Sequence, residues 1–225
     1  MTSDNIYEKA SLYWSKVECS DNGMLGGLVQ VNELDIEDSK EFIKKIELLS
    51  TIPTISMRTC LDCGAGIGRV TKHLLSDKYE TVDLVESNAK FLHHAKTINL
   101  KGLNVSEYYC SSLHIFEFSK NYDCIWIQWV SSQLFNEDYI CFLQRCTDAL
   151  HENGIIVVKE NILRSDVEDD IVMDETDYSF TRTDAGFKKL FDRAGLTVIL
   201  EQLQGNWPEQ LFPVKSYALQ PKQNK

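Results

Sequence analysis

The sequence contains no long hydrophobic run and no excess of basic residues. Its longest aliphatic stretches, such as GIIVV at 154–158, are much shorter than the roughly 20 apolar residues that a membrane-spanning helix needs. Lys and Arg number 23 and Asp and Glu number 34, so the formal net charge is −11. Because phosphate contacts supply most of the affinity of a general nucleic-acid binder, so acidic a chain is poorly suited to that role. We therefore expect no membrane partner and no nucleic-acid partner, and a surface that suits a cationic target.

The sequence also lacks a second C-x-x-C motif and a pair of histidines at the i, i+4 spacing of a metal site. The seven Cys are an odd number scattered along the chain, and the first residues include no apolar signal segment. Both features indicate free thiols in a reducing compartment, for which we expect the cytoplasm and also the nucleus. Cys60 and Cys63 form a single C-x-x-C on a predicted strand, which favours buried thiols over a zinc site. His93 and His94 are adjacent in a helical pattern and so point apart, and we expect no metal site.

The order of apolar and amphipathic segments predicts an α/β fold. The 225 residues suit one large domain, or one domain with an appended segment. From residue 59 onward, short apolar runs alternate with helical patterns, which is typical of a parallel sheet covered on both faces. The last two apolar runs have no helix between them and predict an antiparallel hairpin at one edge. Strands are expected at 59–66, 81–87, 105–113, 122–130, 154–161, 196–204 and 214–220, and helices at 5–18, 34–49, 68–76, 88–99, 136–154 and 181–196.

A glycine-rich segment and an acidic residue follow the first two predicted strands. Ligands of such sheets bind outside the carboxyl ends of the strands. Residues 62–69, DCGAGIGR, contain glycines spaced G-x-G-x-G, which let the backbone turn sharply and approach a ligand closely. Glu86 comes 22 residues after Gly64, where a carboxylate can accept both hydroxyls of a ribose. Taken singly, the glycines also suit an ordinary strand–helix turn, and Glu86 also suits a helix-capping acid.

These motifs resemble those of a known family. The D-x-G-x-G-x-G segment is similar to the first motif of class I S-adenosylmethionine-dependent methyltransferases. Several more specific segments resemble the protein alpha-N-terminal methyltransferases: LDCGAGIGR, YDCIWIQWV, NGIIVVKEN, MDETDYSFTR, YW at 13–14, GMLGG at 23–27 and VKSYAL at 214–219. The resemblance covers nearly the whole chain. It implies a Rossmann-like seven-stranded class I methyltransferase fold, mostly parallel with a C-terminal antiparallel hairpin. It also implies an N-terminal helical extension over 1–52 that contributes to the substrate site, before a methyltransferase domain over 53–225.

The resemblance also implies an activity and a cofactor site. The family transfers methyl groups from S-adenosyl-L-methionine to the α-amino group of proteins that begin X-Pro-Lys after loss of the initiator Met, releasing S-adenosyl-L-homocysteine. Ribosomal proteins are among the expected partners. Arg69 would pair with the cofactor's carboxylate, and Glu86 would hold its ribose. Leu113, which suits the core equally well, and His114 would border the adenine, while Gln128 would close the site. The full set of implied cofactor residues is Gly64, Gly66, Arg69, Glu86, Ser87, Asn88, Leu113, His114 and Gln128.

For the substrate, the resemblance implies an aromatic channel and an acidic contact. Asn161 would hold a substrate carbonyl, and Asp177 would accept the proton of the amine, so these two residues are the implied catalytic pair. Seven of the twelve residues at 166–177 are acidic, and Asp174 and Asp177 among them would select the charged amine and lysine of the peptide. Gln133 stands where the family often has His, and a neutral amide cannot act as a base. The implied substrate residues are Tyr13, Trp14, Leu25, Trp129, Gln133, Asn161, Asp174 and Asp177.

Two other functions remain compatible with these residues. The first is methylation of a small-molecule amine or acid, with the N-terminal segment acting only as a lid. The second is a non-catalytic scaffold that binds S-adenosylmethionine and docks basic proteins on its acidic face. The aromatic residues Tyr13 and Trp14 also suit packing in the core, since aromatic residues at helical spacing are common there.

Overall fold

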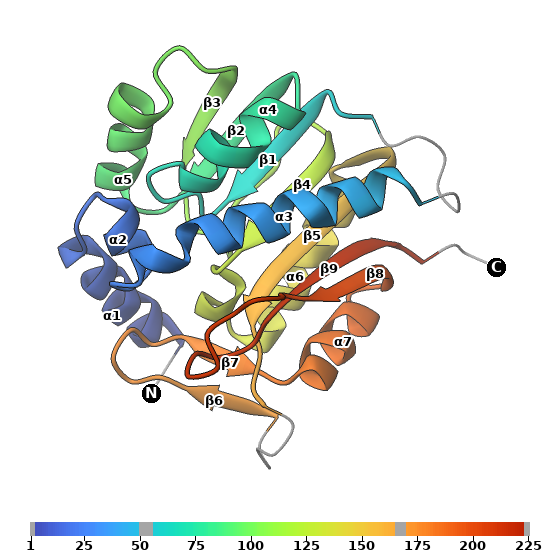
Figure 1. Cartoon of the computed structure of the whole chain (residues 1–225). Helices are drawn as coiled ribbons and strands as arrows, with labels where there is room; N and C mark the ends of the chain where they lie inside the picture. Colours follow the sequence, from blue (N-terminus) through green and yellow to red (C-terminus); the bar gives the residue numbers. More distant parts are fainter. Residues whose placement is uncertain (1–2, 50–55, 165–169, 223–225) are drawn as a thin grey trace.

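The computed structural model describes residues 3–49, 56–164 and 170–222, and these contain a seven-stranded sheet (Figure 1). The strand order is β3-β2-β1-β4-β5-β9-β8. The first five strands in this order run parallel, and β9 is antiparallel to both of its neighbours, β5 and β8. This arrangement confirms the predicted class I methyltransferase fold with its C-terminal antiparallel hairpin. The strands span β1 (Thr59–Cys63), β2 (Thr81–Glu86), β3 (Val105–Cys110), β4 (Tyr122–Gln128), β5 (Leu150–Asn161), β8 (Leu196–Leu203) and β9 (Val214–Pro221).

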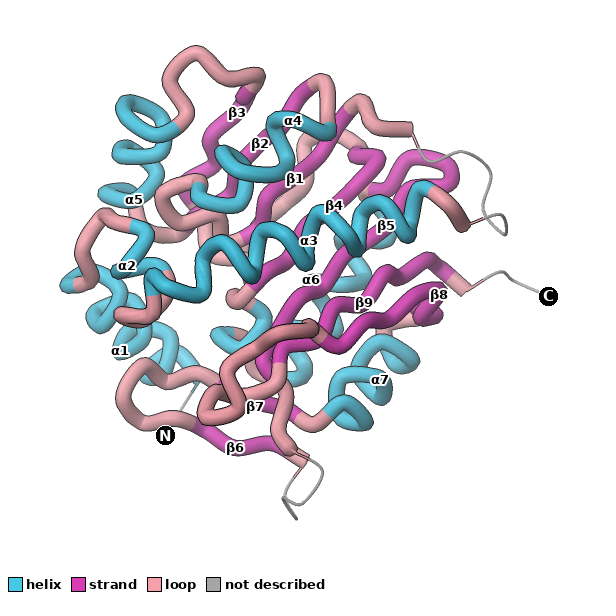
Figure 2. The backbone as a smooth tube through the Cα atoms, viewed as in Figure 1, coloured by secondary structure: helices cyan, strands magenta, loops and turns pink. Residues whose placement is uncertain are grey.

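Helices cover both faces of the sheet, as Figure 2 shows. Helix α3 lies across one face, where Phe42 and Ile43 pack with Trp126 of the central strand. Helices α6 and α7 pack on the opposite face, in the cluster that includes Phe142 and Phe187. The helices span α1 (Ser3–Lys16), α2 (Asp21–Met24), α3 (Asn32–Glu47), α4 (Ser76–Lys78), α5 (Ala89–His94), α6 (Asn136–Asp148) and α7 (Asp184–Arg193). Single turns of π-helix occupy Thr71–Leu75 and Ala95–Asn99, and 3-10 turns occupy Val29–Val31 and Ser131–Gln133.

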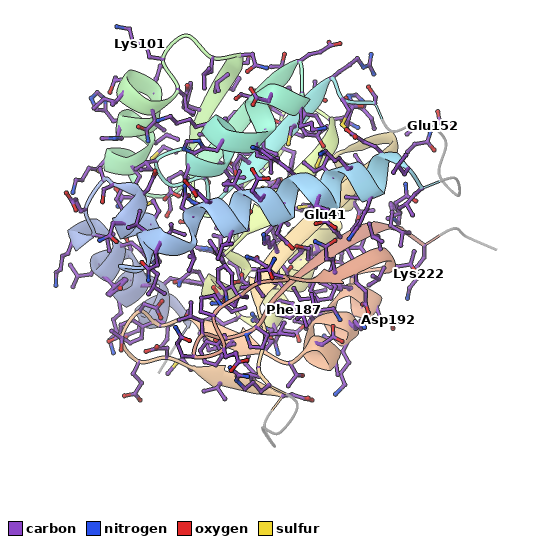
Figure 3. All side chains as sticks on the ribbon, viewed as in Figure 1. Glu41, Lys101, Glu152, Phe187, Asp192 and Lys222 are labelled. Atoms are coloured by element: carbon purple, nitrogen blue, oxygen red, sulfur yellow. The ribbon has the colours of Figure 1, made fainter. Side chains whose placement is uncertain are left out.

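The central strands are mostly apolar because both of their faces are covered. All residues of β4 are buried, including Trp126, and alternate side chains of the strand enter the two cores. Figure 3 shows Phe187 inside the molecule, whereas Asp192 and Lys222 lie at its edge and form an ion pair with an N–O distance of 2.6 Å. The sheet is therefore a rigid base whose carboxyl edge can present polar residues.

One predicted helix end was wrong, and one pair of short strands was not predicted. The helix expected to run to Gly154 ends at Asp148, because residues from Leu150 onward join β5 and Leu150 pairs with Tyr122. Asn153 has a φ of 64°, which no helix interior accommodates. Part of the acidic stretch, for which no strand was predicted, forms a second sheet in which β6 (Ile171–Met173) pairs antiparallel with β7 (Phe180–Arg182). Residues 166–169 of that stretch lie outside the described part of the chain.

The N-terminal helices contribute both to the core and to the carboxyl edge of the sheet. Phe42, Ile43 and Ile46 of α3 belong to one of the two cores. Helix α1 is fixed at the carboxyl edge, where Asn88 Nδ2 donates to the Trp14 carbonyl oxygen at 3.3 Å. The predicted boundary between residues 52 and 53 lies outside the described residues, so the division into two parts stays a prediction. No helix in the described ranges has the length and apolar character needed to cross a membrane.

Candidate active site

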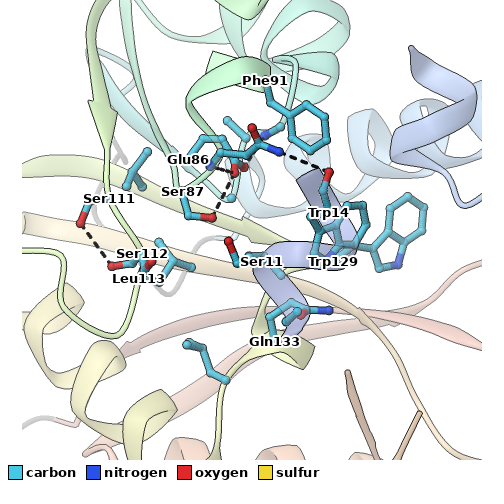
Figure 4. A pocket seen from close by; sticks show the side chains of 18 of the residues that line it. Ser11, Trp14, Glu86, Ser87, Phe91, Ser111, Ser112, Leu113, Trp129 and Gln133 are labelled. Carbon is cyan, nitrogen blue, oxygen red and sulfur yellow. Dashed lines mark hydrogen bonds between the residues drawn. The ribbon is translucent and has the colours of Figure 1, made fainter. Parts of the chain in front are cut away.

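A cavity of about 230 Å³ lies at the carboxyl ends of β1, β2 and β4, beneath helix α1 (Figure 4). This is the edge at which α/β sheets bind their ligands. Its walls come from the glycine segment, from the ends of the strands and from the N-terminal helices. The lining residues are Tyr7, Ala10, Ser11, Trp14, Met24, Gly64, Ala65, Gly66, Arg69, Val70, Val85, Glu86, Ser87, Asn88, Phe91, Ser111, Ser112, Leu113, His114, Gln128, Trp129, Val130, Gln133 and Leu134.

The glycine segment brings its backbone against neighbouring residues where no other residue type fits. Gly64 has a φ of 65°, and a Cβ atom there would lie 2.4 Å from Val130 Cγ2. Gly66 has a φ of 56°, and its Cβ would lie 2.6 Å from Met24 Sδ. Real Cβ atoms do not approach neighbours so closely, and positive φ strains L-residues other than glycine. These two glycines therefore keep the floor of the cavity open to a ligand.

Glu86 places a buried carboxylate beside this segment. Its Oε2 accepts a hydrogen bond from Gly66 N at 2.9 Å, and its Oε1 accepts from Asn88 N at 2.7 Å and Ser87 Oγ at 3.3 Å. Burial raises the pKa of Glu86, and the hydrogen bonds from Asn88, Gly66 and Ser87 oppose that rise. The carboxylate oxygens are thus held in place by backbone donors and retain lone pairs for hydroxyl groups of a ligand.

Arg69 and Gln128, which both line the cavity, are bound to Asp35 of helix α3. Arg69 Nη2 lies 2.8 Å from Asp35 Oδ2, and Gln128 Nε2 donates to both carboxylate oxygens at 2.8 and 2.9 Å. Trp126 Nε1 donates to Gln128 Oε1 at 3.0 Å, so both ends of the Gln128 amide are fixed. Burial opposes the ionisation of Asp35, but Lys159 and Arg69 outweigh it and hold the pKa of Asp35 below its ordinary value. The buried network is therefore charged.

Helix α1 closes the other side of the cavity through aromatic contacts. The Tyr7 ring stacks on His114 with centroids 4.3 Å apart and an interplanar angle of 3°. The Tyr7 hydroxyl donates to Asp138 Oδ2 at 2.5 Å, and burial raises the pKa of Tyr7. Arg145 donates to the carbonyl oxygens of Leu113 at 2.8 Å and His114 at 3.0 Å. These bonds fix the wall that Leu113 and His114 form.

Two residues that line the cavity each have a buried polar atom without a hydrogen-bond partner among the described residues. Trp129 has a φ of 50°, and its indole N–H is buried without a hydrogen-bond partner. Gln133 Oε1 is likewise buried and unpaired. The Arg69 guanidinium carbon lies 5.4 Å from the centre of the Trp129 ring, and the Trp207 ring centroid lies 6.3 Å from that of Trp129. Buried polar groups are normally paired, so one donor and one acceptor in the same cavity indicate a place for a polar ligand.

The comparisons with known proteins agree with this geometry. The sequence model of the AdoMet dependent proline di-methyltransferases matches residues 2–220. The chain belongs to this family.

Similar proteins are found among both curated sequences and solved structures. Alpha N-terminal protein methyltransferase 1 of Dictyostelium discoideum is 46% identical over 222 residues, which cover 97% of this chain and 81% of that protein. N-terminal Xaa-Pro-Lys N-methyltransferase 1 of Homo sapiens is 37% identical over 228 residues, covering 97% of this chain and all of that protein (100%). A solved S-adenosylmethionine-dependent methyltransferase from Leishmania major is 39% identical, with a TM-score of 0.87 over 96% of this chain and 83% of that one.

The proline di-methyltransferase family uses S-adenosylmethionine, and the residues of the cavity fit that cofactor. A Cβ atom on Gly64 or Gly66 would clash with a neighbouring side chain, so the backbone at these two positions carries no side chain and a ligand can approach it closely. The Glu86 carboxylate is buried and suits the two hydroxyls of a ribose. Arg69, a guanidinium at the cavity wall, suits a carboxylate. S-adenosylmethionine carries both the ribose hydroxyls and the carboxylate that these residues suit, and its sulfonium adds a positive charge.

Every predicted cofactor residue lines this cavity, namely Gly64, Gly66, Arg69, Glu86, Ser87, Asn88, Leu113, His114 and Gln128. Of the predicted substrate residues, Trp14, Trp129 and Gln133 also line it. Their individual roles stay predictions.

Five predicted substrate residues do not line the cavity. Tyr13 packs edge-on against Trp14, with centroids 5.4 Å apart, and Leu25 is buried next to Met24. Asn161 ends β5, where it pairs with Val214 of β9. Asp174 and Asp177 lie in the turn between β6 and β7 and accept the backbone N–H groups of Thr176 and Ser179. The roles proposed for these five residues stay predictions.

The turn between β6 and β7, which carries Asp174 and Asp177, lies near helix α1. Lys9 Nζ of α1 lies 5.4 Å from the centre of the Tyr178 ring, immediately after Asp177. The acidic turn therefore borders the helix that covers the cavity.

Several lining residues were missed from sequence. Tyr7, Ala10 and Ser11 lie at helical spacing on the face of α1 that also carries the predicted residue Trp14, so the periodicity of the segment could have identified them. Ser111 and Ser112 directly follow β3, but the strand was predicted to continue to Leu113. Asp35 had no signal in the sequence, because an acidic residue near the start of a helix is ordinarily exposed.

Proposed function

We propose that this enzyme transfers methyl groups from S-adenosylmethionine to the α-amino group of proteins whose N-terminus reads X-Pro-Lys. The observation that carries the proposal is the shape of the cavity described above. It joins the glycine segment and Glu86 to an aromatic part that Trp14 and Trp129 line. A pyrrolidine ring suits aromatic walls, and the unpaired Trp129 N–H and Gln133 Oε1 suit the polar groups of a peptide terminus. The Xaa-Pro-Lys substrate in the name of the human relative supports the same assignment.

The chemistry requires an unprotonated amine in line with a methyl group, which bound S-adenosylmethionine supplies. An α-amino group has a pKa of about 8, so a weak base suffices to keep a useful fraction neutral. We assign Asn161 to hold a substrate carbonyl and Asp177 to accept the proton released when the nitrogen gains its methyl group. The amine's lone pair would form the bond to the methyl carbon as the sulfur–methyl bond breaks and S-adenosyl-L-homocysteine leaves, and the proton would pass to Asp177 directly or through water. Positioning is expected to supply much of the rate.

The acidic turn supports a cationic substrate. Asp174 is exposed and Asp177 half-buried in the turn that borders α1. Their charges suit a protonated terminus and a lysine three residues into the peptide, and the overall charge of −11 steers basic proteins toward the enzyme. Ribosomal proteins are a proposed class of partner for this reason. We also propose the cytoplasm and the nucleus as the locations of the enzyme, because its seven cysteines are all unpaired.

Incubation of a PPKRIA-type hexapeptide with enzyme and S-adenosylmethionine, followed by intact-mass analysis, tests the proposal. Activity would appear as whole methyl increments, and their number gives the degree of methylation. An N-acetylated hexapeptide is the matched control and should gain no methyl group. Asp177→Asn should abolish turnover while the cofactor still binds. Methylation of small amines or acids in a metabolite panel, with no reaction of the hexapeptide, would refute the proposal.

A further inference from the structure

Asp35 is the centre of a buried network that joins three distant parts of the chain. It lies on α3 and is fully buried. Its carboxylate contacts Arg69 at 2.8 Å, Gln128 at 2.8 and 2.9 Å, and Lys159 of β5 at 2.7 Å. One carboxylate therefore satisfies two cations and one amide in a region that water does not reach.

The three partners of Asp35 differ in what they face. Arg69 and Gln128 both line the cofactor cavity, whereas Lys159 does not. Lys159 also has other acceptors on α3: the Asp35 carbonyl oxygen at 3.0 Å, Ser39 Oγ at 2.9 Å and Asp38 Oδ2 at 3.3 Å. The bond from Asp35 to Lys159 thus anchors α3 to the sheet. The bonds to Arg69 and Gln128, in contrast, hold two side chains that line the cavity.

The geometry leaves Arg69 and Gln128 little freedom while Asp35 is charged. Arg69 Nη1 donates to Asn32 Oδ1 at 2.9 Å, and its guanidinium lies 5.4 Å from the Trp129 ring. The Gln128 carbonyl accepts from Trp126, so its NH₂ group must face Asp35. If Asp35 were neutral, its oxygen atoms could no longer attract both cavity residues, and the two cations would lose their buried counter-charge.

We propose that Asp35 is a positioning residue for cofactor binding, which holds Arg69 and Gln128 in the orientation that S-adenosylmethionine requires. It touches neither the substrate nor the cofactor and acts through these two side chains. Because Asp35 belongs to α3, the affinity for the cofactor depends on the N-terminal part of the chain. The inference concerns the cofactor alone and does not depend on the identity of the methyl acceptor.

The test is the dissociation constant of S-adenosylmethionine, measured by isothermal titration calorimetry without any acceptor. Asp35→Asn should weaken binding at least about tenfold, since hydrogen bonds to charged groups are the strong ones. Asp38→Asn is the matched control. Asp38 lies on the same helix and contacts Lys159 at 3.3 Å, but it contacts neither Arg69 nor Gln128. Its replacement should leave the dissociation constant within about twofold.

A second variant separates positioning from a purely structural role. Asp35→Asn with Lys159→Met removes the anion and one of its two buried cations, so the melting temperature without cofactor should recover part of the way toward the wild-type value. If Asp35 positions the cavity residues, the double variant still binds the cofactor at least about tenfold more weakly. Wild-type or tighter affinity in the refolded double variant would overturn the proposal, and so would equal losses of affinity in Asp35→Asn and Asp38→Asn.

Discussion

Asp62, at the centre of the sheet, gives a quantitative test of how the burial of a carboxyl group affects the free energy of unfolding. It lies on β1 between Leu84 of β2 and Trp126 of β4, and it is 2% exposed. Its Oδ2 accepts a hydrogen bond from Thr71 Oγ1 at 2.6 Å. Burial raises the pKa of Asp62 from 3.8 to about 7, against the opposing effects of Thr71 and Arg69. The replacement Asp62→Asn keeps an oxygen for Thr71 but cannot ionise.

The direction of the effect follows from proton linkage. Between pH 4 and 7 the folded state keeps the Asp62 proton while the unfolded state has lost it. The free energy of unfolding therefore falls as the pH rises through this window. A rise in pKa from 3.8 to about 7 is worth about 4 kcal/mol, at about 1.4 kcal/mol for each pH unit. We expect the stability of Asp62→Asn relative to the wild type to increase by this amount between pH 4 and 7 and then to level off.

Urea unfolding of both proteins at intervals from pH 4 to 8.5 measures this difference. Other titrating groups change both proteins alike, so they cancel in the difference between the two curves. Thr71→Val provides a second check. It removes a hydrogen bond that lowers the pKa of Asp62, so the loss of stability should continue to a higher pH than in the wild type. A difference between wild type and Asp62→Asn that stays constant with pH would refute the reasoning.

Four further replacements have expected outcomes. Glu86→Gln should weaken S-adenosylmethionine binding about tenfold or more in calorimetry, because it neutralises the buried carboxylate that we expect to accept the ribose hydroxyls. Gly64→Ala should lower the free energy of unfolding by about 1–3 kcal/mol in urea, because its Cβ would lie 2.4 Å from Val130 at a φ of 65°. Gln204→Met should raise the melting temperature by about 2–4 °C in scanning fluorimetry, because both amide atoms of this buried side chain are unpaired. Gln202→Met should lower it, since that amide donates to Asp38 at 2.8 Å.

Local signals in the sequence were sufficient for the fold. The central strands are mostly apolar runs because both faces of the sheet are covered, and each of them was predicted near its observed position. The glycines at 64 and 66 were informative because their φ values of 65° and 56° are rarely adopted by other residues. These features depend on neighbours in the chain, and so they can be read without the structure.

Features that depend on pairing between distant segments could not be predicted. Residues from Leu150 onward continue a helical pattern, but Tyr122 pairs with Leu150 and draws the chain into β5. The strand at Ile171–Met173 is three residues long, exposed and surrounded by acids, so it lacks the alternation that marks a strand. Only its pairing with Phe180–Arg182 makes it one.

The residues of the candidate site also fall into those that local sequence signals predicted and those that depend on distant partners. Residues that follow strands, such as Glu86, Gln128 and Trp129, were predicted because the topology brings strand ends to one edge. Asp35 was missed because its partners are remote: Gln128 is 93 residues away along the chain and Lys159 is 124. No local pattern distinguishes it from Asp38, one helical turn later, which is not fully buried.

Asp35 and Asp62 show that burial alone does not determine the charge of a carboxyl in this protein. Both are almost inaccessible to solvent, yet the pKa of Asp35 is lowered and that of Asp62 is raised. The difference lies in their partners, because Asp35 contacts Lys159 and Arg69 within 2.8 Å, whereas Asp62 has the Thr71 hydroxyl. Asp35 therefore stays ionised across the neutral range, where Asp62 gains its charge at the expense of the fold. Raising the pH from 6 to 8 should thus reduce the free energy of unfolding while the network around Asp35 keeps the Arg69 guanidinium and the Gln128 amide in place.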